Sequence, residues 1–231
     1  MITKKLFIVL FFAVCTVCFS QTLKGVYTIQ PLKGVGDASE LSERSKKPLY
    51  FIYTYSNNKS FQQLIDGSGT IIDTIYNEYK EVPGKKFASE NVTIRPNDGF
   101  YYKDFKESNY RVFFNQNNIE TYISDHLPKY EWNLINESKI ISGYNCKKAI
   151  TTKKTLNRKI NIVAWYCEDI TIPDGPLDFT GLPGFIIQIE NNDTTIIKFE
   201  KIKLISNDTS EILLPEIAIK PITIKEYETK N

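Results

Sequence analysis

Short runs in which hydrophobic and polar residues alternate recur along most of the chain, and the spacing typical of helices is nearly absent. Aromatic and β-branched residues dominate these runs, as they do in strands whose two faces meet different surroundings. The pattern predicts an all-β domain of antiparallel strands, built as a sandwich, a barrel or a strongly curved sheet. The predicted strands cover residues 23–30, 49–56, 60–65, 110–114, 119–124, 130–134, 143–153, 159–167, 185–190 and 195–204.

Turn and loop signals separate these strands. Asn57 and Asn58 tolerate the positive φ angles of tight turns, so they predict a hairpin, and the Asn-rich stretch 115–118 predicts a second one. The single helix that the spacing allows covers residues 37–47, although its polarity fits a mobile loop equally well. Residues 66–97 have a mixed pattern that favours no element. The chain after Pro215 is expected to be an extended tail.

Residues 1–20 have the pattern of a secretory signal peptide, with two lysines before an apolar run that is too short to span a membrane. The small residues Cys18 and Ser20 suit the two positions that a signal peptidase inspects, which predicts a mature chain beginning at Gln21. Lipid attachment is a weaker alternative because a valine precedes each cysteine of this segment. Residues 21–231 show no repeat or linker and are expected to form one β-rich domain.

Charge and hydropathy narrow the functional classes. The chain carries 29 basic and 27 acidic side chains, and the excess of two equals the two lysines of the signal segment. A balanced mature domain lacks the basic surface by which proteins bind nucleic acid or anionic membranes. Beyond the signal segment no run is long and apolar enough to span a membrane. The sequence predicts an exported protein of the periplasm or cell surface that neither binds nucleic acid nor spans the bilayer.

Two cysteines remain in the mature domain, and a predicted hairpin brings them together. If the strands at 143–153 and 159–167 pair symmetrically about their loop, the numbers of facing residues sum to 313, so Cys146 faces Cys167. The Cβ atoms of directly opposed residues lie close to the range of a disulfide, and an oxidising compartment favours that bond. A Cys146–Cys167 disulfide is therefore predicted, with two buried free thiols as the alternative.

The segment 172–186 is the most distinctive stretch of the chain. Pro183 presets φ for the second position of a type II turn and Gly184 supplies the positive φ of the third, so residues 182–185 are predicted to form that turn. Asp174, followed by Gly and Pro, predicts a second turn just before it. The two turns indicate a rigid loop between two strands, anchored by apolar side chains. The loop lacks the glycine-rich run followed by Lys and Ser or Thr that holds phosphate, so it offers mainly shape.

Within this segment Gly181-Leu182-Pro183-Gly184-Phe185-Ile186 resembles the signature of the GLPGLI family, with Phe185 where the family has Leu. Shorter motifs agree in order with the same family at residues 132–134, 141–144, 146–149, 164–166 and 172–173. The resemblance covers about residues 101–190. It implies a small exported protein of Gram-negative bacteria without an established activity, and hence no catalytic residues. Cys146 occupies a position where family members often have Cys, whereas Cys167 has no such counterpart.

Candidate catalytic groups are few. His126 is the single histidine, which excludes metal sites built from several histidines, and its place in a turn favours a solvated side chain. Asp169, Asp174 and Asp178 are the candidates for a pair of carboxylates near the loop. Asp beside Gly and Pro ordinarily serves a turn, however. No catalytic, metal or cofactor site is predicted, and an enzyme is not favoured.

Three functions are consistent with these features. The leading hypothesis is a non-enzymatic binding or carrier module of the cell envelope that holds an apolar or peptide ligand against a curved sheet, by analogy with the half-barrels of periplasmic lipoprotein carriers. It predicts a concave apolar cavity of about a few hundred Å³. An accessory or structural subunit of an outer-membrane assembly, with the loop at 172–186 as its contact surface, predicts a flat exposed apolar patch instead. A hydrolase predicts two carboxylates within about 10 Å of each other in a cleft.

Overall fold

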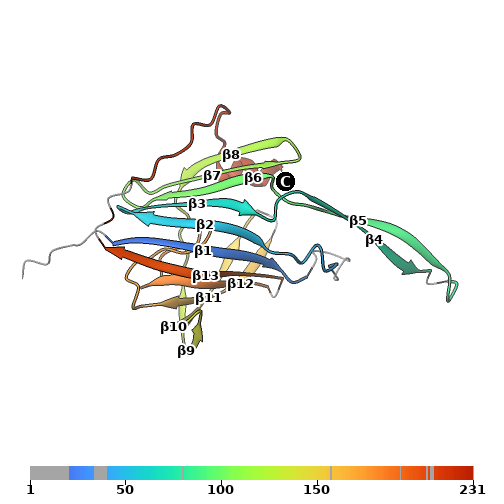
Figure 1. The fold of residues 1–231 in the computed structure, drawn as a ribbon, viewed down its shortest axis with the longest axis horizontal. Coiled ribbons are helices and arrows are strands. Elements are labelled where there is room, and N and C mark those ends of the chain that lie inside the picture. The colour runs from blue at the N-terminus through green and yellow to red at the C-terminus, as the bar shows by residue number, and fades with distance from the viewer. Residues whose placement is uncertain are drawn as a thin grey trace, which may run out of the picture.

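The described part of the chain forms one large antiparallel sheet, one small two-stranded sheet and a short helix near its C-terminus (Figure 1). The computed structural model describes residues 21–33, 41–79, 81–156, 158–192, 194–206, 208 and 211–230. The elements are β1 (Gln21–Pro31), β2 (Leu49–Ser56), β3 (Lys59–Asp66), β4 (Thr70–Glu78), β5 (Lys86–Ile94), β6 (Asp98–Asp104), β7 (Asn109–Gln116), β8 (Ile119–His126), β9 (Asn133–Ile141), β10 (Tyr144–Lys154), β11 (Lys159–Cys167), β12 (Phe185–Asn191), β13 (Thr195–Ser206) and α1 (Ile224–Lys230).

Eleven strands form the large sheet in the order β8-β7-β6-β3-β2-β1-β13-β12-β11-β10-β9, and β4 pairs with β5 in the small one. The predicted strands at 49–56 and 159–167 coincide with β2 and β11, and most of the others differ from the observed strands by at most two residues at either end. The exception is the strand predicted at 130–134, because β9 begins only at Asn133. The preceding aromatic residues leave the sheet and hydrogen-bond to the loop between β11 and β12. The all-β prediction is confirmed.

Asparagine pairs make two of the tight turns. Asn57 and Asn58 have φ angles of 51° and 61° and connect β2 to β3, while Asn117 and Asn118 have φ angles of 53° and 61° and connect β7 to β8. Positive φ at both central residues matches the twist of the flanking strands. Both predicted hairpins are therefore confirmed.

Residues 66–97, for which the pattern favoured no element, contain the small sheet. β4 and β5 project away from the large sheet as a ribbon (Figure 1). Ile72 faces Val92 and Tyr76 faces Ala88 across the ribbon, and Ile72, Tyr76 and Val92 are 53%, 71% and 49% exposed. Strands are predicted on the assumption that apolar side chains face the core and polar ones face solvent. Apolar side chains face solvent in β4 and β5, so these two strands were not predicted.

The helix lies elsewhere than expected. Residues 37–40 of the predicted helix lie outside the described residues, and residues 41–47 form turns and irregular structure. α1 forms instead in the predicted extended tail, where Thr223 and Glu226 bond reciprocally to each other's backbone amides as a capping box. In the described part of the chain no helix is long and apolar enough to cross a membrane. The predicted signal peptide, residues 1–20, also lies outside the described residues.

The large sheet curves around the loop that joins β11 to β12. Lys103 on β6 and Lys153 on β10 both bond to this loop, although six strands separate β6 from β10 in the sheet. One apolar core joins strand residues such as Tyr53 and Phe199 to loop residues such as Phe179 and Leu182. The described strands β8 and β9 end the sheet without pairing to each other, so the curved sheet is open. The loop therefore fills the concave side of the sheet.

Candidate functional site

The loop between β11 and β12 folds back on its own stem. The amide of Phe185 donates to the carbonyl oxygen of Ile170 at 3.0 Å, and the amide of Gly184 donates to the carbonyl oxygen of Leu182 at 2.8 Å. A type II turn over 182–185 has a φ of about +80° at its third residue, whereas the φ of Gly184 is 157°, so that prediction is wrong. The Phe185 amide instead closes the stem of the loop against Ile170.

Gly184 is needed for close packing. Its φ is 157°, and a Cβ atom placed there would lie 2.2 Å from the carbonyl oxygen of Cys167. Leu182 and Phe179 are 1% and 2% exposed, which confirms them as apolar anchors, whereas Pro183 is exposed. The loop is thus held rigidly at its stem and by two apolar side chains.

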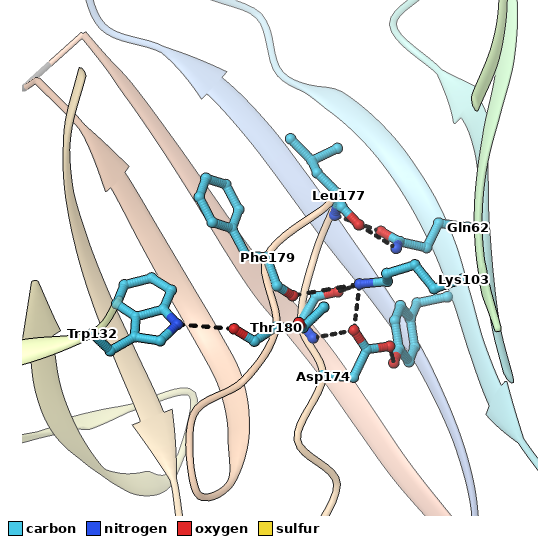
Figure 2. A network of polar contacts seen from close by, with 9 residues as sticks. Gln62, Lys103, Trp132, Asp174, Leu177, Phe179 and Thr180 are labelled. Atoms are coloured by element: carbon cyan, nitrogen blue, oxygen red, sulfur yellow. Dashed lines mark hydrogen bonds and ion pairs between the residues drawn. The ribbon is translucent and has the colours of Figure 1, made fainter. Parts of the chain in front are cut away.

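Lys103 and Asp174 form an ion pair in which both side chains are 0% exposed (Figure 2). The Lys103 ammonium donates to Asp174 Oδ1 and to the carbonyl oxygens of Gly175 at 2.8 Å and Phe179 at 3.4 Å. The Gly175 amide donates to Asp174 Oδ1 at 2.7 Å, and the Tyr53 hydroxyl of β2 donates to Oδ2 at 2.5 Å. The Lys103 ammonium and the two further donors offset the cost of burying the Asp174 carboxylate away from water.

Two further side chains fix the loop to the sheet (Figure 2). The Gln62 amide nitrogen donates to the Leu177 carbonyl oxygen at 3.0 Å, and the Gln62 amide oxygen accepts from the Leu177 amide at 2.7 Å. On the other side, Trp132 Nε1 donates to the Thr180 carbonyl oxygen at 2.8 Å. The two hydrogen bonds from Gln62 hold the backbone of Leu177 at a φ of 53°, which is uncommon for leucine.

Burial sets the protonation of this cluster. Burial lowers the pKa of Lys103, and the charge of Asp174 only partly opposes that effect. Burial also raises the pKa of Tyr53 well above its ordinary value, and Asp174 raises it further. Tyr53 therefore stays protonated and donates its hydrogen bond at every ordinary pH. No solvent reaches Lys103 or Asp174, so the pair is closed to ligands.

Asp178, four residues on, reaches a more open position. Its Oδ2 atom accepts hydrogen bonds from the Tyr130 hydroxyl at 2.5 Å and from Lys153 Nζ at 2.6 Å. The Asp178 side chain is 9% exposed and that of Lys153 is 33% exposed. Burial alone would raise the pKa of Asp178, but the Lys153 charge and the bonds from Lys153 and Tyr130 outweigh it, so the pKa is lowered. Asp178 is a charged carboxylate at neutral pH.

Two adjoining cavities share this pair as a common wall, together with Ile224 and Glu228 at α1, and we call them the groove. One cavity of about 500 Å³, the aromatic half, is lined mainly by apolar side chains that include Tyr101, Val112, Phe114, Ile123 and Ile160. The other, of about 950 Å³, we call the polar half because it adds polar side chains to apolar ones such as Tyr130, Ile150 and Val163; the polar ones include Lys129, Glu131, Asn133, Thr151, Thr152 and Asn161. The groove thus offers two chemically different surfaces that meet at Asp178 and Lys153.

The carboxylates predicted as a pair lie in three different environments. Asp169 is exposed, Asp174 is sealed in the ion pair, and Asp178 lines the groove. His126 ends β8 as an exposed side chain and does not line the groove. Within the described ranges no group of three or more His, Cys, Asp or Glu residues is placed to hold a metal ion.

The two cysteines lie in the predicted register but are not bonded. Lys148 pairs with Trp165 as predicted, which confirms the facing positions in the hairpin. Cys146 and Cys167 are nevertheless buried free thiols, so the predicted disulfide is wrong for this structure. The ladder between β10 and β11 stops one pair short of them, and the Cys146 sulfur is directed at the Tyr144 carbonyl oxygen 3.5 Å away.

Five residues that bind the loop or line the groove were not predicted from the sequence. They are Tyr53, Gln62, Lys103, Tyr130 and Lys153. The sequence did contain an indication for Lys103. It lies two positions from Tyr101, so in a strand the two side chains are on the same face. A lysine on an apolar face needs a buried partner.

Known proteins give a further comparison. A sequence profile described as N-glycanase peptide, N-terminal domain, matches residues 54–226, and no curated protein matches. A structure of PNGF-II in space group P21 aligns with a TM-score of 0.52 and 17% identity, over 91% of this chain and 33% of that one. A structure of PNGF-II in space group C2 aligns with a TM-score of 0.49 and 19% identity, over 80% and 28%. The chain spans about a third of PNGF-II, and identity this low supports a likeness of fold alone.

The profile match corrects the resemblance to the GLPGLI family. It spans the stretch 101–190 that carries the GLPGLI-like motifs and assigns that stretch to a different family. The signature was misleading because Gly-Leu-Pro-Gly is ordinary turn chemistry, which unrelated loops share. The match covers well over half of the sequence, and the chain belongs to the family of the N-glycanase peptide N-terminal domain.

Proposed function

We propose that this chain is an exported, non-enzymatic binding module that holds a glycosylated peptide in the groove. The observation that carries the proposal is the division of the groove into an aromatic half and a polar half that meet at Asp178 and Lys153. A ligand that fits such a groove has an apolar part and a hydroxyl-rich part joined to each other. Peptides that carry glycans have this composition, and the family name points to the same class.

The chemistry of each half suits one part of that ligand. Apolar side chains of a peptide gain by leaving water for the aromatic half, where Tyr101 and Phe114 offer ring surface. Sugar hydroxyls both donate and accept hydrogen bonds, and the polar half presents amides and hydroxyls that do the same at Asn133, Thr152 and Asn161. Binding pockets usually combine apolar walls with a few placed polar groups.

The same geometry supports binding without hydrolysis. A carboxylate acid catalyst needs a raised pKa, whereas the pKa of Asp178 is lowered. Asp174, the nearest candidate partner in sequence, is completely buried and bonded to Lys103. Of the three predicted carboxylates only Asp178 lines the groove, where Glu131 and Glu228 also contribute side chains.

Titration calorimetry tests the proposal with two probes, an N-glycosylated peptide and the same peptide without its glycan. Wild-type protein is expected to bind the glycopeptide at least about tenfold more tightly, a difference of about 1.4 kcal/mol. Thr152→Arg places a long side chain in the polar half and should remove the preference. Thr171→Arg is the matched control, since Thr171 is exposed and lies outside the groove. Equal affinity for both probes, or a cleaved glycopeptide recovered after incubation, would contradict the proposal.

The accessory-subunit hypothesis has support of its own. The exposed apolar face of the β4–β5 ribbon, with Ile72, Tyr76 and Val92, is the kind of flat patch that it requires. This ribbon lies apart from the walls of the groove, so contact with another protein and ligand binding are compatible.

A further inference from the structure

The ion pair of Lys103 and Asp174 has the features of a reactive pair as well as those of a structural one. Its nitrogen and carboxyl groups are in direct contact, and both side chains are 0% exposed. The two residues come from β6 and from the loop between β11 and β12, so a bond between them would link segments that lie far apart in the sequence. Nothing in the proposed binding function uses this pair.

We propose that Lys103 and Asp174 condense to form an intramolecular isopeptide bond. The reaction balances without any other reactant, because an ammonium group and a carboxylate together equal one amide plus one water molecule. A proton first passes from the Lys103 ammonium to the Asp174 carboxylate, which leaves a neutral amine and a carboxylic acid. Nζ then attacks Cγ, the Cγ–O bond breaks, and the oxygen leaves as water with one proton from the acid and one from the amine.

The surroundings favour the neutral amine that this reaction needs. Moving two charges out of water costs several kcal/mol per ion, and buried groups often neutralise instead. Burial lowers the pKa of Lys103, which is the direction that makes an amine available for attack. Contact between the two groups also removes the entropy cost of bringing them together.

Neighbouring donors polarise the carboxyl group. The Tyr53 hydroxyl donates to Asp174 Oδ2 at 2.5 Å, and the Gly175 amide donates to Oδ1 at 2.7 Å. Fixed donors of this kind stabilise the negative charge that develops on oxygen when a nucleophile adds to a carbonyl carbon. The Gly175 carbonyl oxygen, 2.8 Å from Lys103 Nζ, would accept the single N–H that the amide keeps.

Other lysine–carboxylate pairs in the molecule lack this setting and serve as internal comparisons. Lys153 is 33% exposed beside Asp178, and Lys147 is 53% exposed beside Glu168. Both of these ammonium groups are open to water, which competes with the carboxylate for their hydrogen bonds. Condensation is therefore expected at Lys103 and Asp174 and not at these two pairs.

Intact mass of the denatured full-length protein, with its N-terminus established by peptide mapping, tests the proposal. The expected mass is that of the sequence minus one water, and digestion should give one branched peptide that joins the segments around Lys103 and Asp174. A succinimide at Asp174–Gly175 would also lose one water, but Lys103→Met would retain that loss. Lys103→Met and Lys103→Arg should both have the full mass, and either one suffices if the other does not fold.

Asp174→Asn gives an independent check. Attack of Lys103 on the amide of this variant releases ammonia in place of water, so the product has the mass and the branched peptide of condensed wild type. A succinimide formed with Gly175 would have the same mass but no branched peptide. Wild-type protein with the full sequence mass, or with a loss that persists in Lys103→Met or Lys103→Arg, would overturn the proposal and leave an ordinary buried ion pair.

Discussion

Replacing Gly184 with alanine is expected to destabilise the fold more than the same change at another glycine with positive φ. The new Cβ atom would lie 2.2 Å from the carbonyl oxygen of Cys167, 2.7 Å from its carbonyl carbon and 2.9 Å from the Cα atom of Glu168. These are backbone atoms, and Cys167 is paired with Phe185 in the sheet, so the neighbours cannot swing away as a flexible side chain would. Overpacking of this kind costs about 1–3 kcal/mol or more.

Gly181→Ala is the matched control, because it carries the backbone cost without the clash. Gly181 has a φ of 90°, and the nearest atom to its added Cβ is Trp132 Nε1 at 3.9 Å. A left-handed conformation costs a non-glycine residue about 1–2 kcal/mol. We therefore expect Gly184→Ala to cost roughly 2–5 kcal/mol, a large part of a typical total of about 5–15 kcal/mol.

Urea unfolding followed by far-UV circular dichroism measures both free energies. The expected order is wild type, then Gly181→Ala, then Gly184→Ala. Equal losses in the two variants would refute the steric argument, because the backbone conformation alone would then account for the effect.

Three other predictions concern side chains in and around the loop. Leu182→Ala should lower the free energy of unfolding by about 2–5 kcal/mol, because the side chain is 1% exposed, and a loss below about 1 kcal/mol in urea unfolding would show that the loop is not anchored there. Cys146 and Cys167 should stay unlabelled by a thiol reagent in the native protein, since burial and the neighbouring Cys167 raise the pKa of Cys146 to about 12. Both should react after unfolding without reductant, and a product with no label would indicate a disulfide. The folded pKa of Asp178 lies below its unfolded value of about 3.9, so its contribution to stability is fully present above that pH and is lost as the pH falls through the folded pKa. Asp178→Asn should thus be clearly less stable than wild type at pH 7, and the difference measured by urea unfolding should shrink as the pH falls below about 3.9. A difference that does not change with pH would contradict the link to Lys153.

Alternating hydrophobic and polar residues, together with turn residues, were sufficient to predict most strands of the large sheet. The paired asparagines at 57–58 and 117–118 define their hairpins, because positive φ at two successive residues leaves few alternatives. The ribbon of β4 and β5 was not predictable in this way, since its apolar residues face solvent. α1 was missed because a seven-residue helix has too few turns for a periodic pattern, although the capping pair Thr223 and Glu226 was legible in the sequence.

The site was predictable only in part. The segment 172–186 stood out because Pro and Gly restrict its backbone, and the structure places it inside the curved sheet. Its partners Tyr53, Gln62 and Lys103 lie more than 70 residues away along the chain, and no local pattern links them to the loop. The cysteine register was correct while the disulfide was not, because facing positions in a hairpin do not decide which way a sulfur points.

The most direct test of the proposed binding function is a crystal structure of the protein with an N-glycosylated peptide. The proposal predicts electron density in the groove, with the peptide against Tyr101 and Phe114, the sugar beside Asn133 and Thr152, and an uncleaved bond between them. A glycopeptide bound elsewhere on the molecule, or a groove that stays empty at a peptide concentration that saturates binding in solution, would contradict it.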